Sequence, residues 1–392
     1  MPEPTANSQH SVAIAGCGAV TAVGHGVAAL RSALHANISG LRSCSRFDSP
    51  RFQSSVVGAV PQNGSAAAQD DPAYHLATEA LTEAREHART KLESIPAERI
   101  GLVLSTTKAN IEALERVADG RPCSEIARRH LQADLFAADL AVAHGAKGPV
   151  QSVSVACVSG LIAIQQGAKL IQRGAADAVF VAGVDHLSAF VVAGFTSLKA
   201  IDPIGCRPFD RDRCGLSPGE AGAAIVLVRN TNHSTPAITI RGWGTSNDAN
   251  HMTGPSRDGS GLALAIRLAL NSANLQSTDI DYVNAHGTGT PYNDAMESLA
   301  MRVVFGESCP PFSGFKGMLG HTLGAAGIVE TILCVLALQD RLLPGTPRLS
   351  VAAEGTPVSL LREPRSAARL NHILKLNTGF GGINGALILR HE

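Results

Sequence analysis

The chain has 392 residues, a length that suits two domains or one duplicated unit better than a single minimal domain. Apolar residues make up 45% of it and charged residues 17%, a composition that forms a core and excludes a disordered chain. The 33 basic residues are balanced by 33 acidic ones, so we expect no overall basic surface for nucleic acid or an acidic membrane. A local basic patch for one acidic partner stays open.

Signals for export, membrane insertion and covalent cross-linking are not expected either. Residues 1–5 offer no basic start before an apolar segment, which predicts a cytoplasmic protein without a secretory signal. No apolar run approaches the ~20 residues of a membrane helix. The eight cysteines are irregularly spaced and form no CxxC, a pattern typical of reduced thiols and not of disulfides or a metal site.

Strands and helices alternate through the first part of the chain. The first strand, 12–15, is expected to end in a Gly-x-Gly turn at Gly16 and Gly18, but Thr21 stands where a dinucleotide motif needs a third glycine, so no such site is expected. A loop is expected over 61–72. Periodicity predicts helices over 27–35, 73–93, 109–118, 124–143 and 158–173, and strands over 100–105, 149–157, 177–184 and 223–228.

The pattern restarts at residue 237, with a strand that again runs into a Gly-x-Gly turn. Helices are predicted over 260–271 and 324–338, and strands over 281–286, 374–379 and 385–390. This alternation indicates an α/β protein. Because both parts begin in the same way, we expect two similar halves, 1–236 and 237–392, derived from a duplicated unit.

Cys157 is a candidate nucleophile. It lies where a predicted strand meets a predicted helix, and a helix N-terminus favours a thiolate through its dipole and free backbone N–H groups. Its small neighbours Ala156, Ser159 and Gly160 leave room for a substrate. A buried structural cysteine is the alternative interpretation.

Two histidines and a glycine-rich segment are further candidates. His286 ends a buried strand before Gly-Thr-Gly-Thr, where it can project into a cleft. His321 lies in a glycine-rich segment that becomes helical, five residues after Lys316. Each histidine could equally be a hydrogen-bonded core residue, and the segment 379–382 could be an ordinary turn.

Taken together, these segments resemble the β-ketoacyl-ACP synthases of the thiolase superfamily, the elongating enzymes of fatty-acid and type II polyketide synthesis. They occur in the family's order between residues 12 and 390. The matching segments are Val-Ala-Cys157-Val-Ser-Gly, Asn284-Ala-His-Gly-Thr-Gly-Thr-Pro291, Lys316-Gly-Met-Leu-Gly-His-Thr-Leu-Gly-Ala-Ala-Gly327, Gly379-Phe-Gly-Gly-Ile-Asn384, Arg207-Pro-Phe-Asp210 and Gly219-Glu-Ala-Gly222. The resemblance implies a thiolase fold with a duplicated α-β-α-β-α layered architecture.

The resemblance also implies catalytic roles. Cys157 would hold the acyl chain as a thioester, while His286 and His321 would promote loss of CO₂ from malonyl-thioester and stabilise the enolate. Lys316, paired with Glu330, would give electrostatic support. No metal or redox cofactor is implied.

Substrate contacts follow from the same resemblance. The backbone N–H groups of Cys157 and Phe380 would form the oxyanion hole for the acyl carbonyl, and the Phe380 side chain would be a gate beside the sulfur. Gly381 belongs to the same loop. Thr288 and Thr290 would line the pantetheine path, and Phe195 the acyl tunnel.

The chain departs from the family pattern at three positions. Thr378 stands where elongating enzymes have a phenylalanine two residues before the gate, Leu319 replaces a usual threonine, and Ala221 replaces a glycine. Because Thr378 lies near the expected site wall, acyl-chain choice or gate motion is expected to be unusual. Segments 105–110 and 287–294 resemble the synthases of aryl-polyene and flexirubin-type pigment clusters more than those of housekeeping fatty-acid synthesis.

Acyl carrier protein is the implied donor of both thioesters, and a homodimer or a heterodimer with a related synthase subunit is implied. The bulky apolar residues of the segment 184–195 are expected either at that interface or in the core: Leu187, Phe190, Val191, Val192 and Phe195. The alternative function is a non-catalytic chain-length-factor subunit, which typically lacks the nucleophile that Cys157 provides. A thiolase needs a second cysteine, but none follows Cys334, and nothing indicates the peptide cleft of a Cys–His protease.

Overall fold

The computed structural model describes residues 11–61, 70–230 and 237–392. Its main sheet runs in the order β11-β10-β14-β15-β9-β1-β8-β7-β5-β6. One half consists of β1 (Val12–Thr21), β5 (Ile100–Ser105), β6 (Val150–Val153), β7 (Ala178–Asp185) and β8 (Ala221–Arg229). The other consists of β9 (Ile238–Asn247), β10 (Tyr282–Ala285), β11 (Phe312–Gly314), β14 (His372–Gly379) and β15 (Ile383–His391).

The two halves have the same strand topology. From the junction outward, the strands of one half lie in the order β1-β8-β7-β5-β6 and those of the other in the order β9-β15-β14-β10-β11. If the five strands of each half are numbered along the chain, both orders read 1-5-4-2-3. In both, the first two pairings are antiparallel and the next two are parallel. The halves join where residues 12–14 of β1 pair with residues 238–240 of β9. The predicted α/β class and its duplicated architecture are therefore confirmed.

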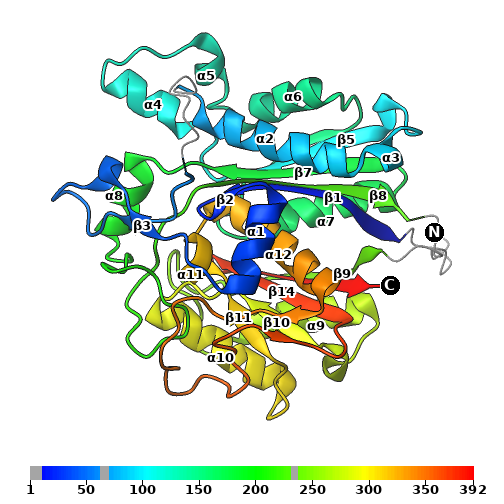
Figure 1. Ribbon diagram of the computed structural model, residues 1–392. Coiled ribbons are helices and arrows are strands. Elements are labelled where there is room, and N and C mark those ends of the chain that lie inside the picture. Colours follow the sequence, from blue (N-terminus) through cyan, green and yellow to red (C-terminus); the bar gives the residue numbers. More distant parts are fainter. Residues whose placement is uncertain (1–10, 62–69, 231–236) are drawn as a thin grey trace.

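Helices cover both faces of each half (Figure 1). The outer layers are α2 (Pro72–His87) with α6 (Ala133–His144), and α9 (Ser260–Ala273) with α10 (Pro291–Phe305). The central layer holds α7 (Ser159–Gln172) and α12 (Ala326–Asp340), which contact each other between the two halves of the sheet. Parallel strands need such helical crossovers. Helix α7 lies in the connection between the third and fourth main-sheet strands of its half, β6 and β7, and α12 lies in the equivalent connection, between β11 and β14.

The predicted Gly-x-Gly turns are wrong, because both glycine pairs lie inside strands. A Cβ atom on Gly16 or Gly18 would lie about 2 Å from a backbone oxygen of α2, at 2.1 and 2.0 Å. In β9, a Cβ atom on Gly244 would lie 2.1 Å from the Ala265 oxygen of α9, and one on Gly242 would lie 2.6 Å from the Ala273 nitrogen. The glycines therefore let an outer helix pack directly on the first strand of each half.

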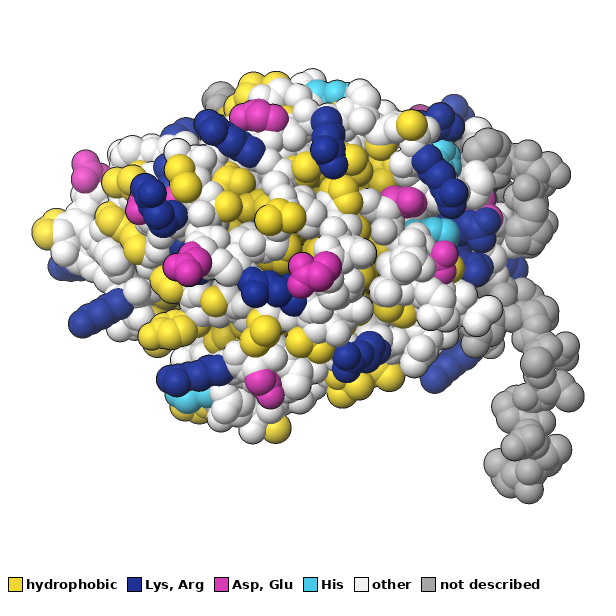
Figure 2. All heavy atoms as spheres, turned by 90° about the horizontal axis from the view of Figure 1, so that it is seen from below, with side chains coloured by type: hydrophobic (Ala, Val, Ile, Leu, Met, Phe, Trp, Pro, Cys, Tyr) yellow, Lys and Arg dark blue, Asp and Glu magenta, His cyan; other side chains and the backbone are white. Residues whose placement is uncertain are grey.

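The lower face of the molecule carries charges of both signs. Figure 2 shows this face, with basic and acidic side chains scattered among apolar ones. The helices α9 and α10 expose apolar residues, namely Leu264, Leu268, Leu299 and Val303. No single-signed field forms there, as expected for a chain whose formal charges cancel.

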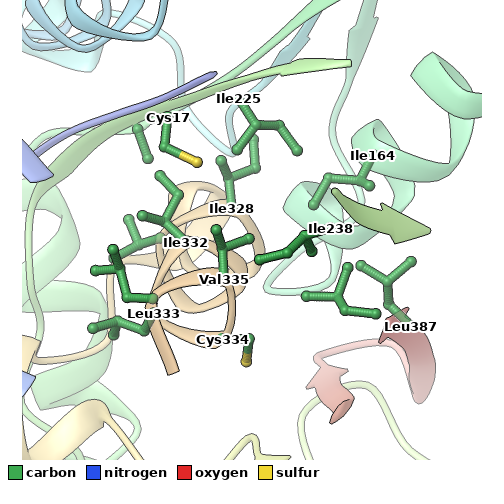
Figure 3. Close-up of a cluster of buried hydrophobic side chains, with 14 of the residues drawn as sticks. Cys17, Ile164, Ile225, Ile238, Ile328, Ile332, Leu333, Cys334, Val335 and Leu387 are labelled. Atoms are coloured by element: carbon green, nitrogen blue, oxygen red, sulfur yellow. The ribbon is translucent and has the colours of Figure 1, made fainter. Parts of the chain in front are cut away.

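The central core surrounds α12, which is buried on all sides and apolar apart from Glu330, Thr331 and its last two residues. Figure 3 shows Ile328, Ile332 and Val335 of this helix among Ile225 of β8 and Ile238 of β9. The 18-residue stretch Leu323–Asp340 is apolar and long enough to cross a membrane, so the expectation that no apolar run approaches that length was wrong; 89% of it is buried inside the protein. Packing between the two halves of the sheet explains this composition, since a helix buried all round needs no solvent-facing polar face.

Several predicted elements differ in extent. The helix expected over 73–93 breaks at Ala88, after which α3 (Arg89–Leu92) follows. The helix expected over 124–143 is two helices, α5 (Glu125–Arg129) and α6, interrupted where the buried His130 bonds Asp71 and Asp139. Helices α8 (Ala189–Ser197) and α10 were not predicted. The start of the chain, most of the predicted loop 61–72 and the residues just before the predicted division at 236 lie outside the described residues.

The remaining elements are short or peripheral. They are α1 (Gly26–Ala36), α4 (Ile111–Ala118), α11 (Lys316–Leu319), the short strands β2 (Gly24–His25), β3 (Arg42–Ser43), β4 (Val56–Val57), β12 (Leu342–Leu343) and β13 (Arg365–Ser366), and the 3₁₀ turns η1 (Ser45–Phe47), η2 (Ala97–Arg99), η3 (Ser277–Asp279) and η4 (Leu323–Ala325).

Candidate active site

Cys157 lies in a tight turn between β6 and α7. The predicted strand 149–157 ends early, at Val153, because Ala156 adopts a left-handed φ of 45°. The Ser159 hydroxyl fixes this turn: it accepts from the Val155 N–H at 2.7 Å and donates to the Ala156 carbonyl at 2.6 Å. Gly160 lies against Gly327, where a Cβ atom would come within 2.9 Å of its backbone. This close approach brings the N-terminal ends of α7 and α12 together.

His321 lies in the segment between α11 and α12 and faces the Cys157 sulfur. Its Nε2 lies 3.0 Å from Cys157 Sγ. The Leu323 backbone N–H donates to His321 Nδ1 at 3.2 Å, so Nδ1 is an acceptor and the imidazole proton resides on Nε2. The structure thus presents a neutral histidine whose N–H points at the candidate nucleophile.

His286 completes the group. Lys316 Nζ and Asn377 Nδ2 both donate to His286 Nδ1, at 3.0 and 2.8 Å, so its proton also resides on Nε2. The rings of His286 and His321 lie 5.2 Å apart with an interplanar angle of 83°. Three residues that are 129 and 35 positions apart in the sequence therefore form one cluster.

A buried charge network lies behind His286. Lys316 Nζ contacts Glu330 Oε1 at 2.8 Å and also donates to the His286 carbonyl at 2.6 Å. Lys375 Nζ contacts the other carboxylate oxygen, Oε2, at 2.7 Å. All three charged side chains are buried, which leaves two cations against one anion.

Sequence reasoning missed Lys375 and Asn377. Both lie on β14 two positions apart, and their side chains reach Glu330 from the same face of the strand. The signal was a lysine between the apolar residues Leu374 and Leu376 of a predicted strand, since a lysine is almost never fully buried unless it is paired.

Burial dominates the ionisation of the cluster. It raises the pKa of the Cys157 thiol to about 11, although the Lys316 and Lys108 charges and the Phe380 backbone N–H favour the thiolate. Desolvation therefore outweighs the stabilisation of the thiolate that we expected from the helix N-terminus. Burial, followed by the lysine charges, lowers the pKa of His286 and of His321 well below the ordinary value, so both rings stay neutral.

A cavity of about 480 Å³ opens onto these three residues. Its walls include four of the five predicted substrate contacts, Phe195, Thr288, Thr290 and Phe380. Thr378 and Gly379 also line it. Phe380 is 38% exposed, and its ring lies 6.2 Å from that of Phe195. Gly381 does not line the cavity, because its backbone turns away and its N–H donates to the Met252 carbonyl at 2.7 Å.

The apolar residues of the segment 184–195 lie partly in the core and partly at the surface. Leu187, Val191 and Val192 pack in a buried cluster of this chain, whereas Phe190 is 60% exposed on α8. Of the three departures, only Thr378 lines the cavity; Leu319 and Ala221 are buried elsewhere. Among the described residues, no group of three or more His, Cys, Asp or Glu side chains is arranged to hold a metal ion.

Thr378 connects the cavity wall to the loop of His286. Its hydroxyl donates to Asn293 Oδ1 at 2.7 Å, and Asn293 Nδ2 donates to Glu297 at 2.8 Å. Glu297 in turn accepts from the backbone N–H groups of His286 and Gly287, at 2.6 and 2.7 Å. Burial raises the pKa of Glu297 to about 7.

Comparisons with known proteins agree with this geometry. The β-ketoacyl synthase N-terminal domain model matches residues 9–233, and the C-terminal domain model matches residues 237–350. The chain is 32% identical to a putative polyketide β-ketoacyl synthase 1 of Streptomyces halstedii, covering 96% of this chain and 97% of that protein. It is also 32% identical to 3-oxoacyl-[acyl-carrier-protein] synthase 2 of Vibrio cholerae, covering 98% of this chain and 99% of that protein.

A solved structure has the same architecture. The ishigamide ketosynthase/chain length factor superimposes with a TM-score of 0.90 at 28% identity, covering 98% of this chain and 100% of that one. The domain matches and the full-length relatives all point to one family. The fold of this chain brings Cys157, His286 and His321 into one cavity. The chain belongs to the β-ketoacyl synthase family of acyltransferases.

Proposed function

We propose that this protein condenses an acyl chain, held as a thioester on Cys157, with malonyl-ACP to give a 3-oxoacyl-ACP and CO₂. The observation that carries the proposal is the 3.0 Å contact between His321 Nε2 and Cys157 Sγ, at the floor of a cavity that also contains His286. The arrangement holds a nucleophile and two N–H donors within reach of one bound thioester.

The first half-reaction is acyl transfer. Cys157 Sγ forms a bond to the acyl carbonyl carbon, the carbon–sulfur bond to the carrier breaks, and the thiol proton ends on the departing carrier thiol. The reaction therefore needs no stored thiolate, which fits a buried thiol whose pKa is about 11. The Phe380 backbone N–H, which favours the thiolate form of Cys157, would also stabilise the oxyanion of the tetrahedral intermediate.

The second half-reaction is decarboxylation followed by carbon–carbon bond formation. The carboxylate–carbon bond of the malonyl group breaks, and its electron pair forms an enolate on the thioester. That carbon attacks the acyl carbonyl, and Cys157 leaves and takes a proton from solvent. Two neutral imidazoles with Nε2–H groups would stabilise the enolate oxygen, since both Nδ1 atoms are occupied by donors.

The buried cations Lys316 and Lys375 have a supporting role in this proposal. Their charges exceed that of Glu330 by one, so they lower the pKa of both histidines and favour anions in the cavity. An enolate is such an anion. Lys316 also holds the His286 backbone and ring, which makes it both an electrostatic and a positioning group.

We also propose an acyl carrier protein as the donor of both thioesters and a dimer as the working state. The Vibrio cholerae relative is named for the acyl-carrier protein, and the ishigamide protein pairs a ketosynthase with a chain length factor. The exposed Phe190 on α8 is a candidate contact for a second subunit. The aryl-polyene branch, a cytoplasmic location and the division into halves at residue 236 stay predictions.

Mass spectrometry tests the function. The purified chain is mixed with acyl-ACP and malonyl-ACP, alone and with any co-encoded synthase subunit. An acyl adduct on Cys157 and a 3-oxo product longer by two carbons are expected. A chain that carries no adduct under either condition would instead be a chain-length-factor-like subunit.

A further inference from the structure

The carboxylate of Asp185 lies outside the substrate cavity, and the proposed mechanism leaves it without a role. Asp185 ends β7 and is fully buried. All of its partners are donors: the Thr106 hydroxyl at 3.0 Å, the Thr107 N–H at 3.1 Å, the Thr107 hydroxyl at 2.7 Å, the Gly324 N–H at 2.6 Å and Lys108 Nζ at 3.3 Å. A buried carboxylate with this many donors is a fixed anchor and not a fluctuating surface charge.

Asp185 anchors the turn η4, which begins at Leu323, the residue whose N–H binds His321. Gly324 is held at both of its polar atoms, because Asp185 accepts from its N–H and the Ser105 hydroxyl donates to its carbonyl at 2.6 Å. The preceding residue, Leu323, has a left-handed φ of 53°, a conformation that costs a branched side chain energy and persists only where its surroundings enforce it. The N–H of that same Leu323 donates to His321 Nδ1.

We propose that Asp185 is a positioning residue for His321: by holding the Gly324 N–H it fixes the strained turn whose Leu323 N–H keeps the His321 proton on Nε2, toward Cys157. The inference rests on the proposed function of His321. It extends that function by adding a group from the opposite half of the fold, because Asp185 lies on β7 and His321 precedes α12.

Lys108 has a separable part in this arrangement. It neutralises Asp185 at 3.3 Å and donates to the Thr107 hydroxyl at 2.6 Å. An asparagine at 185 has only one carbonyl oxygen, for which Lys108 and the Gly324 N–H would compete. With Lys108 present, the oxygen is drawn to the cation and the amide NH₂ faces the Gly324 N–H, which repels the turn. Without Lys108, the oxygen is free to stay on Gly324.

The experiment therefore uses Asp185→Asn alone and together with Lys108→Met. Nitrogen-15 spectra of the full-length protein report the His321 tautomer, with the His321→Asn variant used for assignment. We expect an unprotonated Nδ1 in the parent protein, a mixture of tautomers in Asp185→Asn, and recovery of the parent tautomer in the double variant. This readout does not depend on condensing activity, so it tests the positioning role even if the proposed reaction is wrong.

Kinetics give the second readout. In Asp185→Asn, kcat for condensation is expected to fall roughly 100-fold, the size of effect that a misplaced catalytic group produces, with KM for malonyl-ACP unchanged. The control is Asp177→Asn, which removes the carboxylate paired with Arg99 and Arg229 just before the other end of β7 and should leave kcat as in the parent protein. A parent-like His321 tautomer in Asp185→Asn, or a double variant as altered as the single one, would overturn the proposal.

Discussion

The strands β7 and β14 occupy the same position in the two halves, yet β7 contributes a buried carboxylate and β14 a buried ammonium group. β7 is apolar until Asp185 at its C-terminal end, where Lys108 neutralises the carboxylate. β14 carries Lys375 and Asn377 in its interior, where they reach Glu330. One half therefore contributes a balanced ion pair and the other an excess of positive charge. Duplication explains the geometry, and the differences between equivalent positions explain the chemistry.

The crossover helices α7 and α12 differ in the same way. α7 begins two residues after Cys157, while α12 begins five residues after His321. Because the topologies are equivalent, both residues lie at the inner ends of matching helices, and Gly160 against Gly327 brings those ends into contact. The N-terminal half thus holds the nucleophile, and the C-terminal half holds both histidines.

The largest effect is expected from removing the nucleophile, which the N-terminal half contributes. Cys157→Ala should abolish condensation, because no thioester can form, while the histidine pair can still release CO₂ from malonyl-ACP. Product and CO₂ are measured in parallel by mass spectrometry and ¹⁴C release. Cys309→Ala, a cysteine on the outer side of the C-terminal half, is the control and should behave as the parent protein. Full condensing activity in Cys157→Ala would refute the mechanism.

Removing a histidine should affect both half-reactions. In His321→Ala the enolate loses one of its two N–H donors, and Cys157 loses its 3.0 Å partner. Loss of a single oxyanion donor costs about 10²–10³-fold in kcat, so decarboxylation and condensation should both fall by at least that factor. A variant that still decarboxylates at the parent rate would show that His321 serves acyl transfer alone.

The charge network gives the next prediction, this time for stability. Glu330→Gln leaves Lys316 and Lys375 as two buried cations without their anion, so the free energy of unfolding should fall by about 3–5 kcal/mol. Lys316→Met should cost less, because Lys375 still pairs with Glu330. Urea unfolding monitored by circular dichroism measures both. Equal losses for the two variants would show that Glu330 does not balance two cations.

The pH dependence of stability follows from the depressed histidine pKa values. At pH values below about 6.5, the ordinary histidine pKa, His286 and His321 bind protons in the unfolded chain but stay neutral in the native protein. Each histidine therefore lowers the free energy of unfolding as the pH falls, by up to about 1.4 kcal/mol per pH unit. Glu297 acts in the opposite sense between about 7 and 4.5, because its native pKa is raised. The informative quantity is therefore a difference between variants.

His286→Asn provides that difference. Its unfolding free energy, measured from pH 7.5 to 5.5, should fall less steeply on acidification than that of the parent protein, since one proton-rejecting ring is gone. Asn271→Gln, at an exposed residue of α9 that does not titrate, is the control and should keep the parent slope. Parallel curves for His286→Asn and the parent would mean that native His286 binds a proton at mildly acidic pH.

Much of this arrangement could be predicted from the sequence. Local motifs singled out Cys157, His286 and His321 as candidates, because each stands among small residues, and the resemblance to a known family then joined them in one site. Cys157 and His286 follow strands, whereas His321 follows the short helix α11. The similar starts of the two halves indicated the duplication, although the glycines that carried this signal lie inside strands and not in turns. The direction of the Cys157 pKa shift could not be predicted, since it depends on how deeply the folded chain buries the thiol. Lys375 and Asp185 were missed because their partners are 45 and 139 residues away in the sequence.

The smallest effect is expected at Thr378, the departure that lies in the cavity wall. Its hydroxyl holds Asn293, which holds Glu297 and through it the backbone of His286. Thr378→Val keeps the shape but removes one donor, so stability should fall by about 1 kcal/mol, the usual net value of one hydrogen bond. Because Glu297 retains both backbone N–H groups, His286 should stay in place and kcat should change little. Thr356→Val, at a loop remote from the cavity, serves as the control, and both are compared by urea unfolding and by the chain lengths of their products. A loss of kcat as large as that of His321→Ala would show that the Thr378 hydroxyl acts on the substrate itself.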